Sequence, residues 1–188
     1  MILGWTWGVL LWGWLGLEIV IAIATRTRRS HGTLHDRGSQ WLIWAAIVFS
    51  FFAAGWAAAS GLEMPFSHHT LRIVALVLVA AGLVVRIVAI ATLGKAFSAN
   101  VAIRSTQTLQ RSGLYSWVRH PSYLGMELIF LAVGVWSHNW GSLAVMILLP
   151  TAAVLYRIHV EEIALRSAFG AEYEEYAKTT KRLIPGVY

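Results

Sequence analysis

The sequence predicts an all-α integral membrane protein with about five transmembrane helices. Hydrophobic residues make up 57% of the 188 positions and charged residues only 13%, and the mean hydropathy is +0.62. These values lie outside the usual composition of soluble domains. No segment alternates apolar and polar residues over the roughly ten positions that a membrane-spanning strand requires. The composition and the lack of alternation together favour helices.

Five apolar segments have, or approach, the length of about 20 residues that a helix needs to cross the hydrocarbon core. In chain order they are residues 2–24, 41–62, 71–93, 123–136 and 141–156. The first has no Lys or Arg before its long apolar run, so we expect it to stay in the membrane and not to be cleaved as a signal peptide. Only residues 137–140 separate the last two segments, which predicts a tight antiparallel hairpin.

The basic residues predict the orientation of the chain. Thirteen of the 15 Lys and Arg residues follow the first, third or fifth segment, and with five spans they all lie on one side of the membrane. The positive-inside rule then places the N-terminus outside and the C-terminus in the cytoplasm. The net charge of +6 suits anionic lipid headgroups, so we expect no nucleic-acid partner.

The segments between and after the spans differ in character. Residues 25–40 form a basic loop, and residues 94–119 are too polar to span the membrane but carry enough apolar side chains to form a packed cytoplasmic lid. The stretch 157–169 lacks Pro and Gly, so the fifth helix should continue into the cytosol. Gly170 is expected to end it, and residues 171–179 predict a further C-terminal helix.

A first candidate motif, Arg119-His120-Pro121-Ser122-Tyr123-Leu124-Gly125, stands where the polar loop meets the fourth apolar segment. A residue before proline avoids helical geometry, whereas proline suits the first helical turn. We therefore expect His120 to cap this helix. The amides at such a helix start favour an anion, to which His120 could add a donor. An ordinary loop-to-helix junction is the alternative.

A second candidate lies where the fifth span leaves the membrane. Arg157 and Glu161 are four residues apart and share one helical face, whereas Glu162 points about 100° away. Glu162 repeats the same spacing with Arg166 and is predicted to form a surface ion pair. A surface ion pair is also the alternative for Arg157 and Glu161, but ionisable groups at this depth usually serve a site or a pathway.

Other polar and aromatic residues favour structural roles. Glu18, Arg86 and Glu127 lie inside spans, so we expect them to face the bundle interior, where Glu127 could line the site or form a structural pair. The aromatic stripe of Phe169, Tyr173 and Tyr176 is expected to pack, with ligand contact as the less favoured alternative. The chain has no cysteine, and no carboxylate or thiolate completes a metal site at the outer His68-His69 pair, so no metal is expected.

Read together, these motifs resemble the isoprenylcysteine carboxyl methyltransferase family, which are integral-membrane enzymes related to the phospholipid methyltransferases. The resemblance rests on the patterns Arg-His-Pro-Ser-Tyr-x-Gly, Arg-x-x-x-Glu-Glu, Phe-Gly-x-x-Tyr-x-x-Tyr and a final Ile-Pro, and it covers residues 100–188. It implies S-adenosylmethionine as methyl donor and S-adenosylhomocysteine as product. The chain would then be a single domain, with residues 1–93 as a three-helix transmembrane region and residues 94–188 as the cofactor-binding and catalytic region.

The resemblance also implies roles for individual residues. Arg157 would bind the substrate carboxylate, and Arg157 and Glu161 would be the catalytic pair. The family pattern His-x-Leu-Val-x-x-Gly-x-Tyr appears at residues 107–115, where Gln107 replaces the His and Gln110 a small apolar residue. The implied cofactor contacts are Asn100, Gln107, Thr108, Leu109, Gln110, Tyr115, His120, Pro121, Ser122, Tyr123 and Glu161.

The implied reaction is methyl transfer to the carboxylate of a lipophilic acceptor drawn from the bilayer, above all a prenylated cysteine. A phospholipid or other small-lipid methyltransferase is the first alternative, although an amine acceptor would gain nothing from Arg157. A sterol-type reductase using NADPH is the second; those enzymes share the Arg-His-Pro-like turn but lack the Arg-x-x-x-Glu-Glu helix. A non-enzymatic membrane scaffold or transporter half would bind no S-adenosylmethionine. The oligomeric state stays open.

Overall fold

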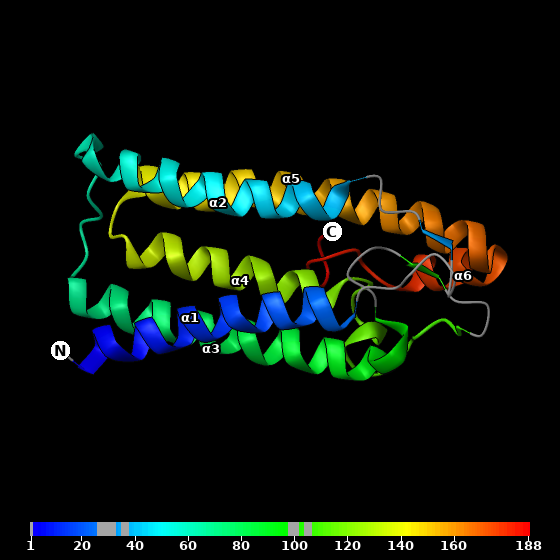
Figure 1. Cartoon of the computed structure of the whole chain (residues 1–188). Helices are drawn as coiled ribbons and strands as arrows, with labels where there is room; N and C mark the ends of the chain where they lie inside the picture. The colour runs from blue at the N-terminus through cyan, green and yellow to red at the C-terminus, as the bar shows by residue number, and fades with distance from the viewer. Residues whose placement is uncertain (1, 26–32, 35–37, 98–101, 104–106) are drawn as a thin grey trace.

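The computed structural model describes residues 2–25, 33–34, 38–97, 102–103 and 107–188 (Figure 1). The long helices are α1 (Ile2–Ala24), α2 (Ser39–Ala57), α3 (His68–Leu93), α4 (Pro121–Trp136) and α5 (Trp140–Phe169), followed by the short α6 (Ala171–Thr179). The described residues also contain the 3-10 turns η2 (Ala58–Ser60), η3 (Gly94–Ala96) and η4 (Gly113–Ser116), and the two-residue strands β1 (Thr33–Leu34) and β2 (Ala102–Ile103), which pair antiparallel. Apart from this pair, the all-α prediction is confirmed.

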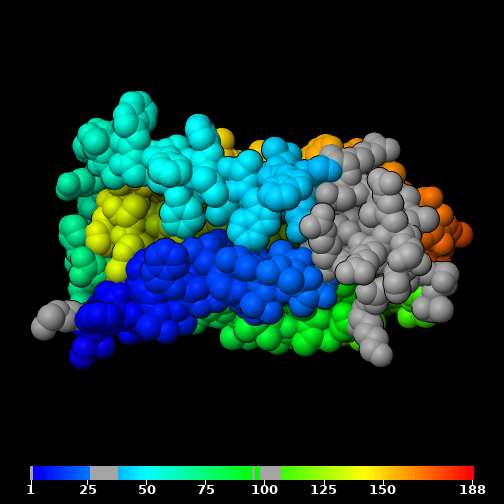
Figure 2. All heavy atoms as spheres, in the orientation of Figure 1, coloured from blue at the N-terminus to red at the C-terminus, as the bar shows by residue number. Residues whose placement is uncertain are grey.

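The helices form a bundle around α4. Helix α4 packs between α3 and α5, while α1 leans on α3 and α2 on α5 (Figure 1). On the face drawn in Figure 2, α1 and α2 lie next to each other. Large apolar side chains point outward along both helices, among them Trp5, Trp12, Phe52 and Trp56. Such a surface suits lipid and not water.

A helix occupies each of the five predicted spans, although their lengths differ. In the described part of the chain, α1, α2 with η2, α3 and α5 are long and apolar enough to cross a membrane, whereas α4 has only 16 residues. Helix α5 has 30 residues and is therefore about 45 Å long, which exceeds a hydrocarbon core of about 30 Å. As expected, it continues past residue 156, ends at Gly170 with φ 50°, and is followed by α6.

The predicted interior charges pair across helices. Arg86 of α3 donates from Nε and Nη2 to the Glu18 carboxylate of α1, and from Nη1 to Ser122 Oγ at 2.7 Å. Trp14 Nε1 also donates to Glu18, at 3.0 Å. Buried charges are tolerated when they are paired and hydrogen-bonded in this way. Contacts of this kind tie α1 and α3 to the first turn of α4.

Glu127, which could have lined the site or formed a structural pair, forms a contact between two helices. Its Oε2 accepts a hydrogen bond from Thr151 Oγ1 at 2.7 Å and so links α4 to α5. Glu127 lines neither of the two cavities described below.

Helices α3 and α4 approach very closely at Gly82 and Gly125. A Cβ on Gly125 would lie 2.7 Å from the carbonyl oxygen of Gly82 and 2.8 Å from the amide nitrogen of Arg86. Both atoms belong to the backbone, so no side-chain rotation relieves the clash. This approach explains the glycine that ends the first motif, and it brings Arg86 within reach of Ser122.

Gly125→Ala should therefore destabilise the bundle by about 1 to 3 kcal/mol, the usual cost of overpacking a core. The free energy of unfolding in detergent micelles measures this effect. Gly16→Ala on α1 is the matched control, because a Cβ there meets no atom within 4 Å. Equal stability of the two variants would contradict the close approach.

Candidate active site

Nine of the predicted cofactor-contacting residues line one cavity at the end of the bundle that carries α6. Its empty volume, which includes space open to solvent, is about 710 Å³. The nine are Gln107, Thr108, Leu109, Gln110, Tyr115, His120, Ser122, Tyr123 and Glu161. Pro121 does not line the cavity; it is buried at the first position of α4. Asn100 lies outside the described residues.

A second cavity adjoins the first and contains Arg157. Its empty volume is about 520 Å³, and Ile21, Ile43, Trp44, Ile47 and Met126 make its wall largely apolar. Glu18, Arg86 and Gln40 add polar groups. Arg157 lines this second cavity and not the first, whereas Phe97 and Tyr123 line both. The two predicted catalytic residues, Arg157 and Glu161, thus belong to two cavities that meet at Tyr123.

The Tyr123 hydroxyl joins these two residues. Arg157 Nε donates to the hydroxyl oxygen at 3.1 Å, and the hydroxyl donates to Glu161 Oε2 at 3.0 Å. The directions are determined because a guanidinium has no acceptor and a tyrosine has one hydrogen. Arg157 and Glu161, which share one face of α5, are therefore linked by hydrogen bonds through Tyr123 of α4.

His120 caps α4 as predicted, but carboxylates of the protein, and not an open anion site, lie beside its ring nitrogens. The backbone carbonyl of His120 accepts from the amides of Tyr123 and Leu124, so the cap is a backbone one. Its Nδ1 lies 3.7 Å from Glu161 Oε2 and its Nε2 3.6 Å from Glu162 Oε1, and the ring stacks on Tyr123. The protein's own carboxylates occupy both sides of the imidazole.

The prediction that Glu162 forms a surface ion pair was wrong. Its side chain is only 1% exposed, and it accepts hydrogen bonds from Arg119 Nε at 3.0 Å and from Arg182 Nε at 3.2 Å. Arg166 does pair with it, at 3.4 Å, as the i,i+4 spacing suggested. Helical spacing identified this one partner, but two arginines distant in sequence bury the carboxylate.

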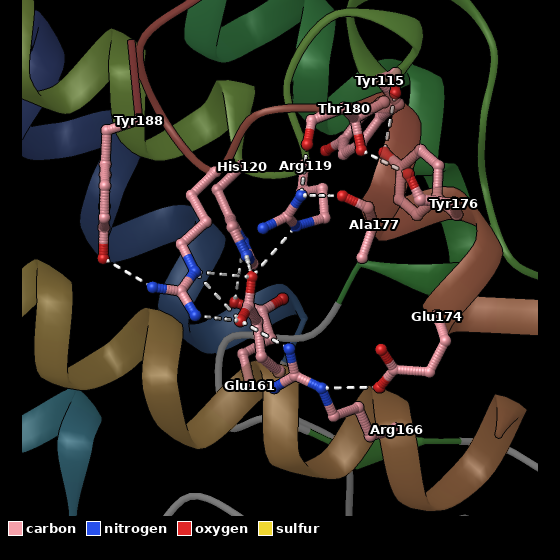
Figure 3. Close-up of polar contacts among 12 residues, drawn as sticks. Tyr115, Arg119, His120, Glu161, Arg166, Glu174, Tyr176, Ala177, Thr180 and Tyr188 are labelled. Carbon is pink, nitrogen blue, oxygen red and sulfur yellow. Dashed lines mark hydrogen bonds and ion pairs between the residues drawn. The ribbon is translucent and has the colours of Figure 1, made fainter. Parts of the chain in front are cut away.

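Glu162 and the arginines 119, 166 and 182 form a cluster that holds the loop before α4, α5 and the C-terminal segment together. Figure 3 shows Arg119 and His120 directed toward α5, and Arg166 directed toward Glu174 of α6. Arg119 also donates to the carbonyl oxygens of Ala177 and Thr180. The amides of Arg119 and His120 in turn donate to residues 181 and 182. This cluster braces one wall of the first cavity.

Three buried tyrosines complete that wall. The hydroxyl of Tyr115 donates to the carbonyl oxygen of Ala89, and that of Tyr176 donates to the carbonyl oxygen of Tyr115 at 2.6 Å. Burial raises the pKa of Tyr176 to about 12, and burial, followed by the charge of Glu161, raises the pKa of Tyr115. Both phenols therefore stay protonated and act as donors at neutral pH.

Tyr173 and Tyr176 are buried and pack as predicted, and both also line the first cavity, as the less favoured alternative of ligand contact requires. Burial, followed by the Glu162 charge, raises the pKa of Tyr173, and its buried hydroxyl has no hydrogen-bond partner among the described residues. Their three-residue spacing in the sequence places them on one face of a helix, but it does not show which residues or cavity that face contacts.

Comparison with known proteins identifies the family of this chain. Residues 73–167, about half of the chain, match the family model for isoprenylcysteine carboxyl methyltransferases. The protein-S-isoprenylcysteine O-methyltransferase of Saccharomyces cerevisiae is 39% identical over 101 residues, which are 53% of this chain and 42% of that protein. A probable enzyme of the same name from Oryza sativa subsp. indica is 34% identical over 114 residues, 60% of each chain. The human enzyme is 36% identical over 90 residues, 43% of this chain and 28% of its own.

A solved structure supports the membrane fold. The eukaryotic intramembrane Ras methyltransferase, an isoprenylcysteine carboxyl methyltransferase, superposes with a TM-score of 0.60 at 25% identity, over 76% of this chain and 52% of that one. The chain thus spans less than two thirds of the length of each of these relatives. On the match over residues 73–167 and the helical arrangement that it shares, this integral membrane protein belongs to the isoprenylcysteine carboxyl methyltransferase family.

Proposed function

We propose that the protein transfers a methyl group from S-adenosylmethionine to the carboxylate of a lipophilic acceptor, with a prenylated cysteine as the preferred substrate. The observation that carries this proposal is the pair of adjoining cavities, one lined by Glu161 and the other by Arg157, which meet at Tyr123. A transferase for a polar donor and an apolar acceptor needs two such compartments with one point of contact.

The first cavity suits S-adenosylmethionine, whose charged groups are a carboxylate, an ammonium and a sulfonium. Glu161 would hold the ammonium, and the rings of Tyr115 or Tyr123 offer π faces to the sulfonium. Gln107, Thr108, Leu109 and Gln110 would cover the cofactor from the segment before η4. When bound, the cofactor supplies an electrophilic methyl group.

The second cavity suits an acceptor with an apolar chain and a carboxylate. Side chains from α1, α2 and α4 provide the apolar wall, while Arg157 provides a planar donor group for a carboxylate. A carboxylate is already ionised at neutral pH, so the site needs no general base. Catalysis then comes from holding the acceptor oxygen in line with the methyl group, which proximity and orientation can supply.

The topology fits the same proposal. The α6 end of the bundle, which carries both cavities, also carries most of the basic residues, so it would face the cytoplasm with the N-terminus outside. Residues 94–188 would supply most of the cofactor site. Residues 1–93 would supply much of the acceptor wall through α1 and α2.

Purified protein given labelled S-adenosylmethionine tests the proposal against its rival. A prenylated cysteine analogue, phosphatidylethanolamine and a fatty acid are offered in parallel. We expect label in the prenylated cysteine, released as methanol by mild alkali because the product is an ester. Label in phosphatidylethanolamine alone would instead identify a phospholipid methyltransferase, and no binding of S-adenosylmethionine at all would overturn the proposal.

A further inference from the structure

Ser39, the first residue of α2, contacts Arg157 of the neighbouring helix α5. Ser39 is completely buried, and its Oγ accepts a hydrogen bond from Arg157 Nη1 at 2.8 Å. The two residues are 118 positions apart. Neither motif of the sequence includes Ser39, and its neighbour Gln40 lines the second cavity beside Arg157.

Contacts with two described residues restrict the orientation of the Arg157 guanidinium. Nε donates to the Tyr123 hydroxyl and Nη1 to the Ser39 hydroxyl. Hydrogen bonds from two different nitrogens of one planar group restrict the rotation of its plane. A carboxylate forms two parallel hydrogen bonds with arginine only when the planes match, so this restriction bears directly on carboxylate binding.

Ser39 contacts Arg157 through a neutral group. The Ser39 hydroxyl carries no charge, so this contact does not itself repel an incoming carboxylate. The amides of the first turn of α2 also place the positive end of a 19-residue helix on this side of Arg157.

We propose that Ser39 is a positioning residue for the acceptor carboxylate: it sets the plane of the Arg157 guanidinium at the wall of the second cavity. This inference rests on the proposed function, because it assigns Arg157 to the acceptor. Ser39 lines neither cavity, so it would act through Arg157. A purely structural hydroxyl that holds α2 against α5 is the competing explanation.

The test is Ser39→Ala compared with Ser50→Ala. Ser50 is also completely buried on α2, but its Oγ bonds to the Ala46 carbonyl oxygen of its own helix. We expect Ser39→Ala to raise the KM for a prenylated cysteine about tenfold, the loss of one hydrogen bond to a charged group, while the Kd for S-adenosylhomocysteine changes less than twofold. Ser50→Ala should change neither.

A second readout separates positioning from structure. The acceptor and its neutral carboxamide analogue are compared as ligands of the protein saturated with S-adenosylhomocysteine, where no transfer occurs. Ser39→Ala should reduce the preference for the carboxylate about tenfold. If Ser39 only holds α2 against α5, the affinities for both ligands should fall alike. Ser39→Thr keeps the hydroxyl and should restore the preference. Ser39→Cys has nearly the volume of serine but is a weak acceptor, so it should behave like Ser39→Ala even if the alanine variant does not fold.

The outcomes distinguish the two proposals. A wild-type protein that methylates no carboxylate would overturn the proposed function and this inference with it. Carboxyl methylation by the wild type, combined with an unchanged carboxylate preference in Ser39→Ala and Ser39→Cys, would overturn the role of Ser39 alone.

Discussion

Arg157→Ala should lower kcat/KM for a lipophilic carboxylate by about 10²- to 10⁴-fold, the equivalent of two lost charge-assisted hydrogen bonds. Arg157 lines the second cavity and not the first, so the Kd for S-adenosylhomocysteine should stay within a few fold of the wild-type value. Initial rates with labelled cofactor and calorimetric titration with S-adenosylhomocysteine measure the two quantities. Retained turnover, or loss of cofactor binding, would sink the assignment of Arg157 to the acceptor.

Two further variants sharpen this prediction. Arg157→Lys keeps a positive charge but loses the planar fork, so it should recover only part of the activity. Glu161→Gln removes the negative charge from the first cavity without changing its shape. It should raise the Kd for S-adenosylhomocysteine about tenfold or more and change the KM for the acceptor less. Arg157 variants should impair use of the acceptor and Glu161 variants binding of the cofactor, as expected for two separate compartments.

Glu162→Ala should reduce the free energy of unfolding by about 3 kcal/mol, which is the lower end for a broken buried ion pair. The variant leaves Arg119 buried beside Arg166 and Arg182 with no carboxylate between them. The effect stays at the lower end because Arg166 and Arg182 are partly exposed and regain water. Denaturant unfolding in detergent micelles measures the change.

Glu174→Ala provides the matched control for Glu162. Glu174 also pairs with Arg166, but its side chain is 56% exposed, so its loss should cost less than about 1 kcal/mol. If Glu162→Ala proved no less stable than Glu174→Ala, the cluster around Glu162 would have no structural importance. Weaker cofactor binding should accompany the loss of stability, because the cluster braces the wall that His120 and Tyr173 belong to.

The helices and their ends could be predicted because their causes are local. Hydropathy located the spans, and the lack of Pro and Gly after residue 156 predicted the extension of α5 to Gly170. His120 before Pro121 predicted the start of α4 for the same local reason. The burial of Glu18 and Arg86 followed from the cost of exposing charge to lipid, although the sequence could not name their partners, which are each other, Trp14 and Ser122.

The candidate site could be predicted only in part. Nine of the residues implied by the resemblance do line one cavity, yet spacing along a helix could not reveal that Arg157 belongs to another. Glu162 shows the limit most clearly, because the same spacing rule that found Arg166 said nothing of Arg119 and Arg182. Ser39 carried no signal at all, since a single serine before an apolar run is ordinary.

The sequence by itself determined an all-helical membrane protein with its motif residues at one end, since hydropathy, capping and turn chemistry act between residues close along the chain. Only the tertiary structure decided which charges are buried, which cavity each catalytic candidate lines, and which hydroxyls orient Arg157. Those properties depend on how α2, α4 and α5 approach one another, and contacts between Arg157 and Ser39 or between Glu162 and Arg119 join positions 118 and 43 residues apart. Helical periodicity cannot encode such distances, because it relates a residue only to its neighbours on the same helix.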